Sequence, residues 1–169
     1  MANEPSRISD LIVERLYVSS VAQLPQASIG NTQISPTAAI AASKVTQQRV
    51  IPFRDGNSDD AAATKTFPLA AAVGAGAYVR FSAGLIDACA GAATVTVDLL
   101  KNGSTVLDAP ITLDNSQADR ELVDAVFDLP IVEPAADDVF EVAIVATAGG
   151  GTLGKGLFGH LIINEAAAT

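Results

Sequence analysis

The sequence contains one histidine and one cysteine, so any chemistry that needs either side chain depends on His160 or Cys89 alone. A Ser-His-Asp hydrolase would rest on His160, and no Gly-x-Ser-x-Gly motif accompanies it. A thiolate zinc site and an intrachain disulfide both need more than one cysteine. Cys89 lies in LIDACAGAA, where no base is near in sequence to activate it. We therefore expect a buried structural thiol at Cys89. We also expect His160 to be a hydrogen-bonded structural histidine that shares a strand face with Phe158 and Ile162.

Two loops carry partial ligand-binding patterns. The run GGGTLGKG (149–156) fits the G-x-x-x-x-G-K part of a phosphate-binding loop, but Gly156 stands where that pattern requires Ser or Thr. A predicted strand, not a helix, follows it. The run DGNSDD (55–60) lacks the D-x-[DN]-x-[DN]-G order and the later Glu of a calcium loop. We expect a strand connection at 149–156 and a solvated acidic loop at 55–60, with an opportunistic cation site as the alternative there.

Paired carboxylates could also act together, as in glycoside hydrolysis, and the sequence alone does not place them in space. Sugar sites usually offer aromatic platforms, whereas this chain has no Trp and two Tyr. We therefore predict no catalytic residue, no metal ligand and no cofactor, and we expect a protein that is not an enzyme.

Composition and charge narrow the choice of partners. The 169 residues include 19 Asp and Glu against 10 Lys and Arg, and this net charge of −9 opposes binding to nucleic acid phosphates. No run approaches the roughly 18 apolar residues of a membrane span. The polar, acidic start has no signal-peptide pattern, so we expect synthesis in a cytoplasm and no membrane partner. A hydrophobic fraction of 49% favours a folded chain whose acidic surface keeps it soluble, with a specific basic partner as the alternative.

Residues 48–165 have the patterns of an all-β fold. In TVTVDLLKNGSTVLDAPITL (94–113), apolar and polar residues alternate, and Asn102-Gly103 supplies the two positive-φ positions of a type I′ turn. We predict a hairpin there, with Val106 on the return strand and Pro110 at an edge, a bulge or a strand break. Further strands are predicted at 49–54, 64–70, 78–88, 120–132, 137–148 and 156–166. About eight strands predict an antiparallel β-sandwich or jelly roll, because each half-buried sheet must cover another.

Residues 1–47 have a different sequence pattern, from which we predict an extended N-terminal arm. We expect residues 166–169 to form a short tail. Pro and Gly interrupt regular structure in the arm. An apolar residue nevertheless returns every five or six positions, and solvated disorder would not require this spacing. We predict that these residues anchor the arm on another surface: Leu24, Ile29, Ile34, Ile40 and Val45.

Three runs resemble bacteriophage virion proteins, particularly fibres and capsid-surface proteins. They are LPQASIGNTQISPTAAIAASKV in the arm, then VTVDLLKNGSTVLDAPITL and DDVFEVAIVATAGGGTLGKGLFGHLIINE in the sandwich. The resemblance covers residues 22 to 165 and is carried by structural motifs. A single sandwich with an arm is similar to capsid decoration, or cement, proteins.

That resemblance implies a structural component of the virion, located on the capsid surface. Its partners would be the major capsid protein and further copies of itself, in a homotrimer. The first alternative is a tail fibre or baseplate protein, in which the arm forms a trimeric shaft. The second is a carbohydrate-binding module.

Overall fold

The computed structural model describes residues 46–130 and 133–166, and all regular structure within these ranges is β. The strands are β1 (Thr46–Asp55), β2 (Lys65–Ala71), β3 (Gly76–Asp87), β4 (Thr94–Lys101), β5 (Ser104–Thr105), β6 (Ile111–Leu113), β7 (Val123–Asp124), β8 (Val139–Thr147) and β9 (Lys155–Ala166). β1 begins two residues before the predicted start of the sandwich. The predicted arm, apart from its last two residues, lies outside the described residues.

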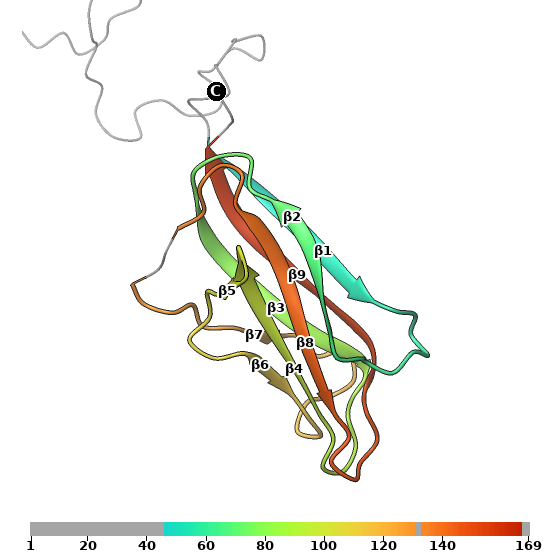
Figure 1. Cartoon of the computed structure of the whole chain (residues 1–169). Helices are drawn as coiled ribbons and strands as arrows, with labels where there is room; N and C mark the ends of the chain where they lie inside the picture. The colour runs from blue at the N-terminus through green and yellow to red at the C-terminus, as the bar shows by residue number, and fades with distance from the viewer. Residues whose placement is uncertain (1–45, 131–132, 167–169) are drawn as a thin grey trace, which may run out of the picture. The chain divides into compact units, whose positions relative to one another are not determined.

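The strands form two antiparallel sheets. One has the order β1-β9-β3-β7, and the other has the order β2-β8-β4-β5, with β6 also paired to β4. The pairs are therefore nested: β1 with β9, β2 with β8, β3 with β7, and β4 with β5 and β6. A long hairpin folded over in this way is a jelly roll, which confirms the predicted fold class. The long strands of both sheets run in a similar direction (Figure 1), as in aligned sandwich packing.

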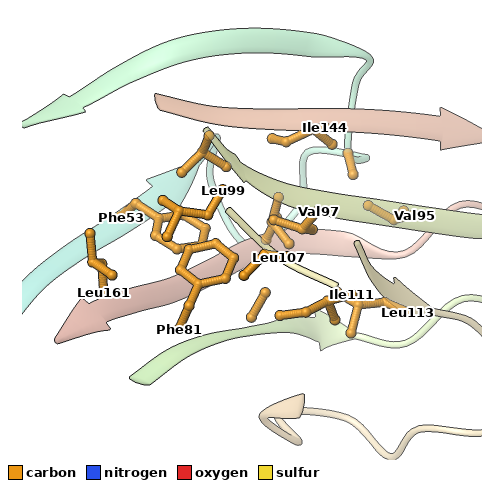
Figure 2. Packing of buried hydrophobic residues seen from close by; sticks show 14 of the residues in the cluster. Phe53, Phe81, Val95, Val97, Leu99, Leu107, Ile111, Leu113, Ile144 and Leu161 are labelled. Atoms are coloured by element: carbon orange, nitrogen blue, oxygen red, sulfur yellow. The ribbon is translucent and has the colours of Figure 1, made fainter. Parts of the chain in front are cut away.

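The core lies between the sheets and follows the period-2 alternation of the strands. Every second residue of β4 and of β8 is buried, and these side chains meet those of β1, β3 and β9. The rings of Phe53 and Phe81 stack with their centroids 5.6 Å apart. Figure 2 shows these two rings next to Leu99 and Leu161 in the space between the strands. Each such side chain contributes about 1.5–3 kcal/mol when it is fully buried.

The predicted hairpin is present, but its return strand is interrupted. Asn102 and Gly103 have φ values of 51° and 80°, which confirms the type I′ turn. β5 ends at Thr105, so Val106 lies beyond it and not on a strand. Val106 N still donates to Leu99 O of β4 at 3.1 Å, and the ladder with β4 then resumes at Ile111, directly after Pro110. Of the edge, bulge or strand break predicted at Pro110, the structure shows a strand break, which fits a proline because it cannot donate to the ladder.

Residues 120–132 form less regular structure than predicted. The strand assignment there shrinks to β7, which pairs only two residues with β3. The chain then crosses to the second sheet, where Phe127 forms an isolated bridge with Leu107. Asp128 N donates to Val106 O at 3.0 Å, so this segment links the sheets along one side of the sandwich.

Candidate interaction surface

His160 lies on β9, and a serine and an aspartate lie on β3 and β7 of the same sheet. These are the residue types of a catalytic triad, but their hydrogen bonds do not follow the order of a triad. Ser82 is opposite His160 in the ladder, and its hydroxyl donates a 2.5 Å hydrogen bond to Asp124 Oδ1. A catalytic triad needs the histidine between the serine and the carboxylate. Here the proton of Ser82 points to the carboxylate, so His160 is not placed to accept it. The sequence could not bring these residues together, because they come from three strands.

The expectation of a hydrogen-bonded His160 is not met within the described residues. Its imidazole is half-buried and has no hydrogen-bond partner among them. The predicted face is correct: Phe158 and Ile162 are half-buried like His160, whereas Leu161 between them is in the core.

Cys89 is a buried structural thiol, as predicted. Its side chain is in the core, and its Sγ accepts a hydrogen bond from Gly154 N at 3.3 Å. The thiol therefore joins the loop after β3 to the loop before β9.

The Gly-rich run connects β8 to β9, which confirms the strand connection. Its glycines allow close packing against residues 88–93. A Cβ at Gly149 would collide with Ala92 O, and a Cβ at Gly151 would collide with Ala90 O. Ala90 and Thr152 pair in an isolated bridge at the same place. These glycines therefore pack two loops together, and no helix follows them as in a phosphate-binding loop.

The acidic run 55–60 is only partly solvated, because Asp55 differs from the expectation. Asp55 is 6% exposed and forms an ion pair with Lys65 at the start of β2. Asp59 and Asp60 are exposed, and Asp60 Oδ2 accepts a 2.7 Å hydrogen bond from Asn57 N. No three His, Cys, Asp or Glu side chains converge as a metal site in residues 46–130 and 133–166. Over the same residues, no helix is long and apolar enough to cross a membrane.

The first exposed surface that stands out is the outer face of β1 and β9, which combines apolar side chains with an arginine. Residues opposite each other in an antiparallel ladder point to the same face, and the alternate residues of these strands are buried. The outward residues are Gln48, Val50, Pro52, Arg54, Phe158, His160, Ile162 and Asn164. We call this set the Arg54 face. It holds no carboxylate. Val50 is 57% exposed, opposite the half-buried Ile162.

A β-bulge extends the apolar part of this surface. The ladder between β3 and β9 shifts between Tyr78 and Arg80, so Val79 is the extra residue. Val79 and Arg80 are both exposed, whereas Tyr78 and Phe81 on either side pack in or against the core. Arg80 forms an ion pair with Asp124 of β7 at 3.1 Å. The bulge therefore places a valine and a paired arginine beside the Arg54 face.

The second exposed surface lies around the segment that follows β7, the opposite edge strand of this sheet, and crosses to the second sheet. Residues 122–128 alternate: Val123, Ala125 and Phe127 pack against the core, and the residues between them are exposed. Val126 and Leu129 are 68% and 77% exposed. Asp108 N donates to Val126 O at 2.9 Å, which brings a further carboxylate to this side. We give the name Val126 edge to five of the exposed residues here and leave out Asp124, which is paired with Arg80: Asp108, Leu122, Val126, Asp128 and Leu129.

The predicted arm anchors Leu24, Ile29, Ile34, Ile40 and Val45 all lie outside the described residues, so their role stays a prediction. Sequence patterns missed both exposed surfaces. The alternation in RVIPFR (49–54) could have grouped Val50 with Arg54, but it does not tell which face of the strand is outward. No protein-family model matches the chain, and no curated protein and no solved structure is significantly similar to it.

Proposed function

We propose that this protein is a non-enzymatic virion structural protein, a capsid decoration protein that stabilises the shell of a bacteriophage. It binds the major capsid protein through its N-terminal arm and associates with further copies of itself, as a trimer. Its place is the outer surface of the capsid.

The observation that carries this proposal is that the N-terminal segment joins the sandwich at an edge strand. Thr46 is the first residue of β1 and is opposite Ala166 of β9, and β1 is one of the two edge strands of its sheet. Forty-five residues precede it, with an apolar residue at every fifth or sixth position between Leu24 and Val45. A segment that continues from an edge strand carrying the exposed Val50 and Pro52 can reach another protein. Such a segment can cover a large surface with few residues.

The jelly roll also occurs in sugar-binding proteins, so the fold alone does not choose the function. The aromatic side chains favour the decoration protein over the carbohydrate-binding module. Every described Phe and Tyr is buried or half-buried. Phe53, Phe81 and Phe140 are in the core, and Tyr78 and Phe127 stack against each other. These five rings serve packing. Phe158 is half-buried on the Arg54 face, and a single ring does not form an aromatic platform for sugars.

A variant pair tests the arm. Ile29→Asp with Ile34→Asp removes two apolar anchors, each of which contributes about 2 kcal/mol if buried on the capsid. Thr32→Asp with Ser35→Asp is the matched control, because it adds the same charge between the anchors. We expect the first variant to lose binding to phage particles and the control to keep it, while both keep the circular dichroism of a β protein. Equal binding by both variants would contradict the anchoring role.

The location is tested by electron microscopy of intact particles. We expect density for the sandwich on the outer capsid surface at a local symmetry axis. Density on the tail would replace this proposal with the tail fibre or baseplate function. Limited proteolysis adds a second readout: residues 1–47 should be cleaved in the free protein and protected on particles.

A further inference from the structure

We propose that a second copy of this chain places its Val126 edge on the Arg54 face of the first, in a head-to-tail contact. This inference deepens the proposed function, on whose self-association it rests, by naming the two surfaces that meet. It is argued from charge complementarity and from exposed apolar side chains on residues that the structure describes.

The Arg54 face is unusual within an acidic protein. The chain has a net charge of −9, yet the outward side chains of β1 and β9 include no carboxylate. Arg54 is exposed and has no ion-pair partner among the described residues. Val50 and Pro52 beside it are exposed as well. A basic group among exposed apolar side chains fits a partner that is both apolar and acidic.

The Val126 edge has that complementary chemistry. Val126 and Leu129 are the two most exposed large apolar side chains of the described residues. Asp108 and Asp128 are exposed beside them, and neither carboxylate has an ion-pair partner in residues 46–130 and 133–166. Backbone hydrogen bonds fix the edge, since Asp108 N donates to Val126 O and Asp128 N donates to Val106 O. The backbone at Asp108, Val126 and Asp128 is therefore held before the edge binds, which lowers the entropy cost of association.

The topology makes the contact head-to-tail. The Arg54 face lies on β1 and β9, whereas the Val126 edge flanks β7, the other edge strand of the same sheet. The two surfaces therefore lie on different sides of one copy. Each copy can use its face for one neighbour and its edge for another. Contacts between two different surfaces close into rings when the rotation between copies allows it. The proposed trimer is the smallest such ring.

The test measures the mass of the purified full-length chain by sedimentation velocity over a range of concentrations. Arg54→Glu and Asp128→Lys each oppose the contact and should weaken self-association by about tenfold or more. The double variant restores opposite charges across every contact, so it should return to within about threefold of the natural chain. Val50→Asp and Val126→Asp should weaken association without any rescue by charge.

Two controls change similar residues elsewhere. Asp59→Lys reverses an exposed charge in the loop after β1, and Val145→Asp changes a valine of β8 that is 51% exposed. Both should associate like the natural chain. At about 1 M salt, where the Debye length is about 3 Å, the natural chain should associate more weakly and the double variant should respond in the same way.

Three results would overturn the inference. They are a natural chain that stays monomeric at every concentration, single variants that associate normally, and a double variant that stays as weak as the singles. The last result would indicate contact between like surfaces. Because these measurements use no particle, their failure leaves capsid binding through the arm to be judged by the Ile29 and Ile34 variant.

Discussion

Asn102 Nδ2 donates a 2.7 Å hydrogen bond to Asp138 Oδ1, and this contact joins the β4–β5 turn to the loop before β8. Asn102 uses its other groups on the same neighbour segment. Its Oδ1 accepts from Val139 N at 2.8 Å, and its backbone N donates to Val139 O at 2.9 Å. Asparagine suits this position for two reasons. It tolerates a positive φ, and its side chain can hydrogen-bond to groups that would otherwise need a backbone partner.

Asp138 is the centre of this connection, so its replacement should destabilise the fold. Its Oδ2 accepts from Ala135 N at 2.8 Å and lies 3.4 Å from Lys101 Nζ. We expect Asp138→Ala to lower the free energy of unfolding at pH 7 by about 1–2 kcal/mol. Urea unfolding followed by circular dichroism measures this loss. Asp59→Ala, in an exposed loop, is the control and should change little.

The same carboxylate predicts a pH dependence. The hydrogen bond from Ala135 N, with further contributions from Asn102 and Lys101, holds the pKa of Asp138 below its ordinary value of 3.8. The unfolded chain therefore binds more protons than the folded chain as the pH falls below 3.8, and the stabilisation is lost there. We expect the stability deficit of Asp138→Ala to be full at neutral pH and to shrink below pH 3.8. A deficit that is constant down to pH 2.5 would show that the charge plays no part.

Local chemistry predicted the turn at Asn102, but not the partner of its side chain. Adjacent positive-φ residues and the alternation around them are encoded in a few neighbouring positions. Asp138 is 36 residues away, and β1 pairs with β9, more than 100 residues later. A period of two predicts that a residue lies on one face of a strand, but it does not predict which strand lies next to it. The sandwich could therefore be predicted, while its strand order could not.

The exposed surfaces were missed for a related reason. In RVIPFR, Val50 and Ile51 are both apolar, so alternation alone does not say which one faces the core. The pairing of β1 with β9 decides it, because Ile51 is opposite the buried Leu161 and Val50 is opposite Ile162. The bulge at Val79 has no sequence signal, since it adds one residue to an otherwise regular strand. The Val126 edge lies in a stretch that was predicted as strand and is mostly a crossing segment.

We expect the substitution Tyr78→Phe not to destabilise the protein. Its ring stacks on Phe127 at 4.8 Å and meets the edge of Phe140 at 6.0 Å. Its hydroxyl is buried without a hydrogen-bond partner in residues 46–130 and 133–166. Tyr78→Phe keeps the ring and removes this hydroxyl, so we expect the free energy of unfolding to stay the same or rise by about 1 kcal/mol. Tyr78→Ala removes the ring as well and should cost about 3 kcal/mol.

Burial, with smaller contributions from Asp138 and Glu133, also raises the pKa of Tyr78 above its ordinary value of 10.0. The folded chain then keeps a proton that the unfolded chain loses, so stability should fall as the pH rises above 10. Tyr78→Phe should reduce this fall, as measured by urea unfolding from pH 8 to 11. A loss of more than about 1 kcal/mol in Tyr78→Phe at pH 7 would instead mean that the hydroxyl has a partner beyond the described residues.

At Gly159 we expect the addition of a single methyl group to destabilise the fold strongly. It faces the core on β9, opposite Phe53 and Ala83. A Cβ at this position would lie within 3.0 Å of both Ser82 O and the Phe53 ring. Ser82 is held in the middle of the sheet, and Phe53 rests on Phe81, so neither neighbour can move freely. We expect Gly159→Ala to lower the free energy of unfolding by about 3 kcal/mol through overpacking.

Two further variants test this cause. At Gly150 a Cβ would meet nothing within 4 Å, but φ is 85°, so Gly150→Ala should cost about 1 kcal/mol through backbone strain alone. Phe53→Leu makes room beside Gly159, so adding it to Gly159→Ala should cost less than the two single losses together. The chain has no Trp, and circular dichroism is the suitable signal for these unfolding curves. Additive losses in the double variant would contradict a collision with the Phe53 ring and leave the Ser82 carbonyl as its source.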